Sequence, residues 1–233
     1  MNKSKSQGWI EWWIGAAAVA LVLGLSSVLS LRAGTTAVIS TTTSPLPFYG
    51  SKNFTPQWLT PQEASGPAVH RVADFSLSNQ LGAVVTSAQT DGKIYVASFF
   101  FSTCPGICPT LKSKLSLVQS RYLDDDDVLI LSHSIRPTSD TPAILQQYAT
   151  RNGIVAGKWH LLTGERSALY ALAKGSYFAS DDLGEEAGLQ EFLHTENLLL
   201  IDRERRIRGV YNGLSRTSVE HLIDDIAVLK GER

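Results

Sequence analysis

Long apolar runs along the chain predict buried β-strands. The clearest runs are Lys93–Phe101 (KIYVASFFF), Val128–Ser134 (VLILSHS) and Asn197–Asp202 (NLLLID). The first of them lacks the alternation of apolar and polar residues that a half-exposed strand shows, as expected when both faces of a sheet are covered. We therefore predict a sheet whose central strands are buried.

The segments between these strands change to the spacing of amphipathic helices. Pro109–Arg121 carries apolar residues on one helical face, and Asp140 or Thr141 can cap a helix that has Pro142 in its first turn. The other expected elements are the strands Arg71–Leu77, Ala83–Thr86, Trp159–Thr163 and Ile207–Tyr211, the helix Glu165–Lys174 and a helix over about 215–229. Strand–helix alternation followed by two strands and a helix predicts an α/β domain with a mixed sheet flanked by helices, in the thioredoxin-like order.

Another apolar run, near the N-terminus, has the length of a membrane helix. Ile14–Leu31 is apolar apart from two glycines and three serines, and its length of about 18 residues is near the lower limit for crossing a bilayer. Three tryptophans precede it, as do Lys3 and Lys5, which favours a cytoplasmic N-terminus. We predict an uncleaved, single-pass anchor over residues 1–32 in the inner membrane, with the domain on the extracytoplasmic (periplasmic) side. A cleaved signal peptide is the alternative.

The rest of the chain divides into a linker and one domain. Residues 33–68 begin with a stretch rich in Thr and Ser, and Pro45 and Pro47 follow, a composition typical of a linker. The domain is expected to occupy residues 69–233. The net charge of -1 shows no excess of basic residues of the kind that binds nucleic acid, so no such partner is expected.

The two cysteines of the chain lie in one short motif after the first buried strand. Cys104 and Cys108 are separated by three residues, and Pro109 follows. A disulfide-stapled scaffold would need more cysteines, spread along the chain. With the second cysteine at a helix N-terminus, both sulfurs can meet as a redox-active disulfide or as two legs of a metal chelate. The helix dipole is expected to stabilise a thiolate at Cys108.

Three segments of the chain match the motifs of a known family. They are Phe99–Pro109 (FFFSTCPGICP), Ser139–Pro142 (SDTP) with the helix after it, and Phe192–Thr195 (FLHT) before the strand Leu198–Asp202. On these segments, the chain from about residue 70 onward resembles the Sco/SenC family. Members of that family are thioredoxin-fold copper proteins that help to assemble cytochrome c oxidase.

The resemblance implies a copper site. Two cysteines and one histidine bind copper in the Sco/SenC family, and the corresponding residues here are Cys104, Cys108 and His194. Thiolates are soft ligands that suit Cu(I), and an imidazole suits Cu(I) and Cu(II) alike. We expect one copper ion per chain, as Cu(I) or Cu(II). In a thioredoxin-like fold the turn before the penultimate strand faces the cysteine loop, and Glu191–Asn197 is that turn.

The resemblance leaves two functions open. The first is an accessory protein, a metallochaperone, that delivers copper to the dinuclear copper site of a haem-copper oxidase subunit, its partner. The second is an enzyme, a thiol–disulfide oxidoreductase with Cys104 and Cys108 as its redox pair, that keeps the cysteines of that subunit reduced. The C-x3-C spacing differs from the C-x-x-C of thioredoxins, and His194 stands where thioredoxins have a cis-proline. We therefore favour copper delivery.

The chain departs from the family pattern in one motif. Many members carry D-P-x-R-D-T-P, whereas this chain has Arg136 in place of the first Asp and Ser139 in place of the Arg. An arginine near the site would favour the thiolate forms of the cysteines. His133, near the end of a buried strand, is a further candidate for contact with the site. Neither cysteine has the P-x3-[TS]-x2-C pattern of a peroxiredoxin, which argues against a peroxidase.

Overall fold

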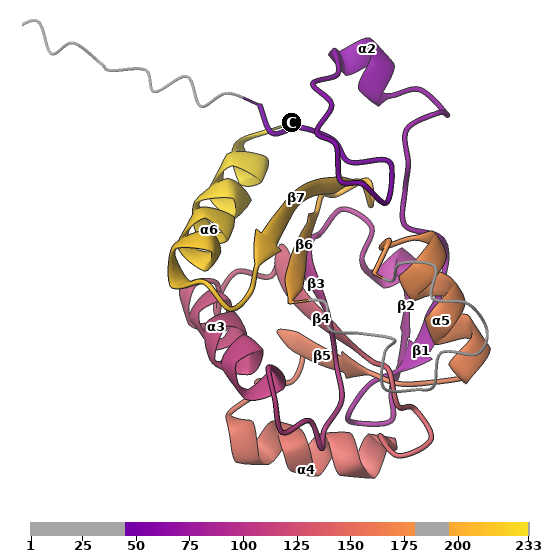
Figure 1. The fold of residues 1–233 in the computed structure, drawn as a ribbon, viewed down its shortest axis with the longest axis vertical. Helices are drawn as coiled ribbons and strands as arrows, with labels where there is room; N and C mark the ends of the chain where they lie inside the picture. Colours follow the sequence, from indigo (N-terminus) through magenta and orange to yellow (C-terminus); the bar gives the residue numbers. More distant parts are fainter. Residues whose placement is uncertain (1–44, 180–195, 233) are drawn as a thin grey trace, which may run out of the picture. The chain divides into compact units, whose positions relative to one another are not determined.

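The computed structural model describes residues 45–179 and 196–232, and its centre is a five-stranded mixed sheet in the order β5-β4-β3-β6-β7 (Figure 1). The three parallel strands are β3 (Ile94–Phe100), β4 (Val128–Ser134) and β5 (Trp159–Leu162). β6 (Asn197–Ile201) is antiparallel both to β3 and to β7 (Ile207–Asn212). Every residue of β3 is buried. The predicted α/β domain with a mixed sheet is confirmed.

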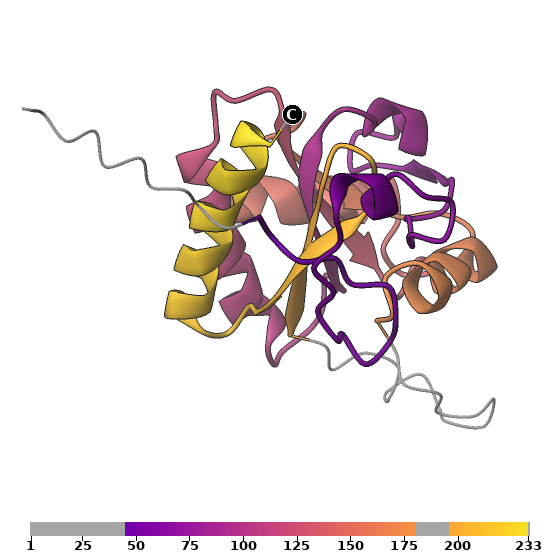
Figure 2. The same cartoon turned by 90° about the horizontal axis from the view of Figure 1, so that it is seen from above.

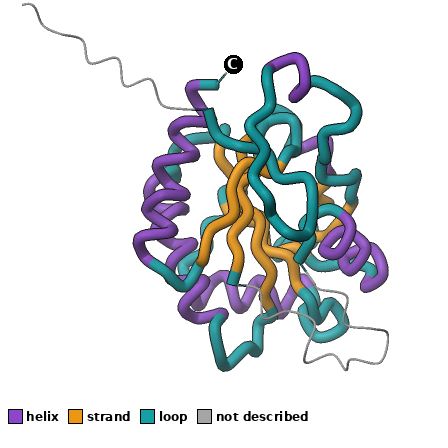
Figure 3. The backbone as a smooth tube through the Cα atoms, turned by 45° about the horizontal axis from the view of Figure 1, so that its top comes forward, coloured by secondary structure: helices purple, strands orange, loops and turns teal. Residues whose placement is uncertain are grey.

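Helices cover both faces of the sheet, as Figures 2 and 3 show from two further directions. One apolar cluster lies on the face covered by three helices, which are α3 (Cys108–Arg121), α4 (Pro142–Asn152) and α6 (Arg216–Gly231). A second apolar cluster lies on the other face, under α5 (Arg166–Gly175). Two shorter elements are α2 (Pro61–Ala64) and the 3-10 helix η1 (Ser87–Gln89).

The β5 edge of the sheet is covered by a small hairpin. Its strands are β1 (Ser76–Ser78) and β2 (Val84–Thr86). In the turn between them, the side-chain amide of Gln80 donates to the carbonyl of Trp159 at 2.8 Å and accepts from the N–H of Leu161 at 2.8 Å. This amide therefore takes the place of a neighbouring strand and satisfies backbone groups that would otherwise invite edge-to-edge pairing.

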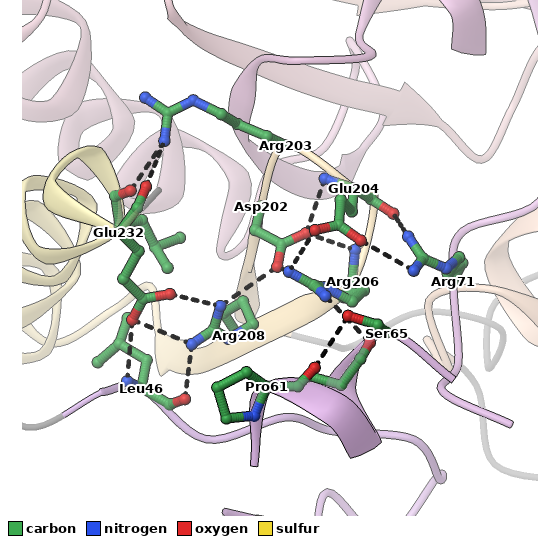
Figure 4. Close-up of polar contacts among 12 residues, drawn as sticks. Leu46, Pro61, Ser65, Arg71, Asp202, Arg203, Glu204, Arg206, Arg208 and Glu232 are labelled. Atoms are coloured by element: carbon green, nitrogen blue, oxygen red, sulfur yellow. Dashed lines mark hydrogen bonds and ion pairs between the residues drawn. The ribbon is translucent and has the colours of Figure 1, made fainter. Parts of the chain in front are cut away.

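A buried arginine fixes the first described residues to the sheet (Figure 4). Arg208 of β7 is 3% exposed, and it donates to the carbonyl of Leu46 at 2.7 Å and to that of Pro47 at 3.1 Å. Its Nη1 lies 2.8 Å from the carboxylate of Glu232 and 3.3 Å from that of Asp202. One side chain thus joins the beginning of the described chain, the strand and the residue that follows α6.

Part of the segment predicted as a linker therefore packs on the domain. The N–H of Tyr49 also donates to the carbonyl of Ile207 at 3.0 Å, on the β7 edge of the sheet. The division of the chain at residues 32 and 68 stays a prediction. Ile14–Leu31, the predicted anchor, lies outside the described residues, and among those described no helix is long and apolar enough to cross a membrane.

His133 is enclosed in the core on the α5 face. Its ring stacks on Phe99 with 5.3 Å between centroids, and lies 5.1 Å from the ring of Tyr177. Nδ1 donates to the carbonyl of Ser98 at 3.3 Å, while Nε2 has no hydrogen-bond partner in the part of the chain that the structure describes. Because burial disfavours the charged imidazolium, the pKa of His133 is lowered to about 4.

We expect Arg208→Ala to lower the free energy of unfolding by about 3–5 kcal/mol, because it leaves the carbonyls of Leu46 and Pro47 without their donor and removes a cationic partner of the Asp202 and Glu232 carboxylates. The matched control is Arg216→Ala, which removes an exposed ion pair with Glu220 and should cost less than about 1 kcal/mol. Equilibrium denaturant unfolding of both variants measures the difference. Equal and small losses would contradict a structural role for Arg208.

His133 should make the fold sensitive to acid. Its pKa in the folded state lies below the ordinary value of 6.5, so the unfolded chain takes up the proton first as the pH falls. The contribution of neutral His133 to the free energy of unfolding is complete above pH 6.5. It decreases by about 3 kcal/mol as the pH falls from 6.5 to about 4. In His133→Leu this part of the pH profile of unfolding should be absent. Parallel profiles for the two proteins would refute the assignment.

Candidate metal and thiol site

The cysteine motif forms the loop between β3 and α3. β3 ends at Phe100, and α3 begins at Cys108 with Pro109 in its first turn, where a missing N–H costs no helical hydrogen bond. Cys104 is half-buried within the loop, and its N–H donates to the carbonyl of Phe101 at 3.2 Å. The predicted location of the pair, on a loop that enters a helix, is confirmed.

Burial controls the chemistry of Cys108. Its side chain is 7% exposed and belongs to the apolar cluster under α3. Both cysteines are free thiols. Burial, followed by the hydrogen bond with Cys104, raises the pKa of Cys108 to about 12, so this thiol is protonated at neutral pH. The expectation that the helix N-terminus stabilises a thiolate here is wrong, because the cost of desolvation outweighs the helix dipole.

Tyr148 of α4 forms another wall of the site. Cys108, Phe100 and Tyr148 line one narrow cavity, and the two aromatic rings are 5.6 Å apart. Burial, followed by the electrostatic influence of Cys108 and of Cys104, raises the pKa of Tyr148 to about 12. Tyr148 was not predicted from the sequence, although its helical spacing from the buried Leu145 was a usable signal.

The loop before α4 reaches the cysteine loop from the side of β4. Thr141 caps α4 with its side chain, so the carboxylate of Asp140 is not needed as a cap. That carboxylate instead accepts hydrogen bonds from Ser102 in the cysteine loop. The guanidinium of Arg136 lies over the ring of Phe101, 4.2 Å from its centroid. The residue that departs from the family pattern thus stacks on the first residue after β3.

His194 lies outside the described residues, but the sheet defines where the chain that follows it arrives. Ala97 of β3 pairs with Leu199 of β6 in antiparallel register. The chain that enters β6 through Glu196 therefore arrives at the same end of the sheet at which β3 enters the cysteine loop. This is the carboxyl end of the parallel strands, where open α/β proteins carry their sites.

A close backbone approach joins the chain that enters β6 to the turn after β7. The N–H of Gly213, in the turn after β7, donates to the carbonyl of Glu196 at 2.8 Å. A Cβ at Gly213 would lie 2.4 Å from Cδ1 of Leu111 and 2.8 Å from that same carbonyl oxygen. Only glycine fits this position, so it lets the turn after β7 pack between Leu111 of α3 and the chain that enters β6.

His133 does not join the site. The aromatic residues that stack on it belong to the cluster under α5, whereas Cys108 belongs to the cluster under α3, on the other face. The hypothesis that His133 contacts the cysteines is therefore wrong. Along residues 45–179 and 196–232, no group of three or more His, Cys, Asp or Glu side chains is placed to hold a metal ion. The donors that the structure describes are two adjacent thiols, a set that suits a soft ion such as Cu(I).

Comparisons with known proteins agree with this geometry. The SCO1 protein homolog of Bacillus subtilis (strain 168) is 26% identical over 167 residues, which cover 71% of this chain and 86% of that protein. The structure of BsSco, a member of the Sco family of cytochrome c oxidase assembly proteins with a disulfide switch, superimposes with a TM-score of 0.61 at 25% identity, over 72% of this chain and 98% of that one. Bradyrhizobium japonicum ScoI with copper bound gives a TM-score of 0.55 at 25% identity, over 68% and 99%.

The likeness extends over most of the domain. These structural matches show that the fold is the thioredoxin-like Sco fold that the resemblance implied. The model of the SCO1/SenC family matches residues 63–230, a range that contains both cysteines, His194 and every strand of the five-stranded sheet. The chain is therefore a member of the SCO1/SenC family.

Proposed function

We propose that this protein binds copper and delivers it to the dinuclear copper site of a cytochrome c oxidase. The observation that carries the proposal is the pair of free, hydrogen-bonded thiols, Cys104 and Cys108, at the carboxyl end of the parallel strands. Support comes from relatives, since BsSco belongs to a family of oxidase assembly proteins and a ScoI structure contains copper. The copper-site subunit of the oxidase is the proposed partner.

The proposed copper ligands are Cys104, Cys108 and His194. Copper bound there would be cargo for the oxidase, held by two soft sulfurs and one imidazole nitrogen. Cys108 is a protonated thiol before binding, so it must release its proton as the metal–sulfur bond forms. Glu196 enters β6 at the end of the sheet where β3 leads into the cysteine loop. This supports a position for His194 near the sulfurs, because the two residues of chain from Glu196 to His194 span at most about 7 Å.

The proposed location of this chemistry is outside the cytoplasm. Ile14–Leu31 would anchor the chain in the inner membrane, with Lys3 and Lys5 on the cytoplasmic side. The site would then face the compartment in which an oxidase subunit exposes its own copper ligands.

A thiol–disulfide oxidoreductase is the second candidate, and one observation favours it. Cys104 is half-buried whereas Cys108 is buried, as expected of an attacking thiol and a resolving thiol. In that reaction Cys104 would attack a disulfide of the oxidase subunit, and Cys108 would displace the mixed disulfide. Two electrons and two protons would pass to the subunit, and this chain would be left with a Cys104–Cys108 disulfide.

Copper titration of the reduced protein tests the proposed ligands. Cys→Ser at residue 104 or 108 replaces a soft thiolate by a hydroxyl, so we expect binding of one copper ion to collapse by at least about 100-fold. His194→Ala should weaken Cu(II) more than Cu(I), since two thiolates can still satisfy linear Cu(I). His221→Ala, on the exposed side of α6, is the matched control. Copper spectra that His194→Ala leaves unchanged would remove that residue from the site.

Oxidase assembly in cells separates the two candidates. His194 has no part in exchange between sulfurs, so His194→Ala should leave reduction of a disulfide substrate nearly intact. We expect cells with this variant to lose oxidase activity as fully as cells with Cys104→Ser, because copper capture fails in both. Normal oxidase activity with His194→Ala, beside failure with Cys104→Ser, would instead identify a reductase.

A further inference from the structure

A buried carboxylate lies behind the cysteine loop. Asp140 is 1% exposed. One of its oxygens accepts from the hydroxyl of Ser102 at 2.5 Å, and the other accepts from the hydroxyl of Ser134 at 2.5 Å. The N–H of Ser102 reaches both oxygens, at 3.2 and 3.3 Å. The carboxylate therefore bridges the end of β4 and the cysteine loop.

The hydrogen-bond pattern shows that the carboxylate is the acceptor in these contacts. The hydroxyl oxygen of Ser134 already accepts from the N–H of Arg136 at 3.0 Å, so its proton is free to point at Asp140. The backbone N–H of Ser102 can only donate. Donors of this kind stabilise a buried negative charge and make short, strong hydrogen bonds to it.

The contacts of Asp140 act on the loop that carries Cys104, the cysteine that no helix holds in place. Cys108 is fixed by α3 and by the apolar cluster. Cys104 lies in the loop, and its described backbone contact is with Phe101, the residue before Ser102. Since Asp140 holds Ser102 on its N–H and on its hydroxyl, it sets the direction in which the chain leaves β3 toward Cys104.

We infer that Asp140 is a positioning residue that holds Cys104 against Cys108 through Ser102. The inference rests on the proposed function in that these cysteines are taken as the reactive pair. Thiols that are held in place have a high effective concentration toward each other and toward a shared metal ion. Release of the loop should therefore weaken both the disulfide and the chelate, whatever its effect on the stability of the fold.

Two serine variants make a matched test. Ser102→Ala and Ser134→Ala each remove one hydroxyl donor from the same carboxylate, at the same O–O distance. The first acts on the cysteine loop, and the second on β4. The measurements use the full chain in detergent. They are the equilibrium between the dithiol and the disulfide in glutathione buffers, which needs no metal, and Cu(I) affinity by competition with a chelator.

In Ser102→Ala we expect the equilibrium constant for disulfide formation to fall about tenfold, which raises the reduction potential of the disulfide by about 30 mV. The affinity for Cu(I) should fall by a similar factor. Ser134→Ala should stay within about twofold of the wild type in both. Asp140→Asn, which keeps the shape but turns one acceptor into a donor, should match or exceed Ser102→Ala.

Equal shifts in the two serine variants, or no shift in Ser102→Ala, would overturn the inference, because the carboxylate would then serve the fold alone. These outcomes differ from failure of the proposed function, in which the wild type itself binds no copper. In that case a potential that changes in Ser102→Ala but not in Ser134→Ala would still establish Asp140 as a positioning residue for the thiol pair.

Discussion

The burial of β3 on both faces is the constraint on which the rest of the structure depends. Its two polar side chains are satisfied inside the core, the Tyr95 hydroxyl by that of Tyr177 at 3.3 Å and the Ser98 hydroxyl by that of Ser132 on β4 at 2.7 Å. That hydroxyl in turn accepts from the indole N–H of Trp159 at 2.8 Å. Because the strand offers no polar group to solvent, the chemistry must begin where the strand ends. The cysteine loop, the Asp140 loop and Glu196 all lie at that end.

The same burial decides how the two thiols differ. A helix N-terminus offers roughly half a positive charge, and in an exposed cysteine this would lower the pKa. Cys108 enters the core with its helix, so the cost of taking a thiolate out of water is larger and the pKa rises to about 12. The fold thus holds one thiol protonated in the core and the other, Cys104, in a half-buried loop that polar contacts must position.

The sequence was a good guide to elements and a poor one to contacts between distant residues. The apolar run of β3, the proline-rich cysteine motif and the helix after it are local patterns, and each was predicted to within a few residues. Asp140 and Thr141 were equal candidates for the helix cap, and the sequence does not show that Asp140 instead contacts Ser102, 38 residues away. The bond from Arg208 to Leu46 spans 162 residues. The thiolate expectation for Cys108 failed because a motif does not show how deeply its side chain is buried.

A network of polar contacts lies at each end of the sheet, and the two networks hold different parts of the chain. The Arg208 network joins Leu46, Asp202 and Glu232 at the amino end of the parallel strands (Figure 4), whereas Asp140 follows β4 at the carboxyl end. A seven-residue strand such as β3 separates these ends by about 23 Å. The two networks share no residue, so the contacts that hold Leu46 are separate from those that position the cysteine loop.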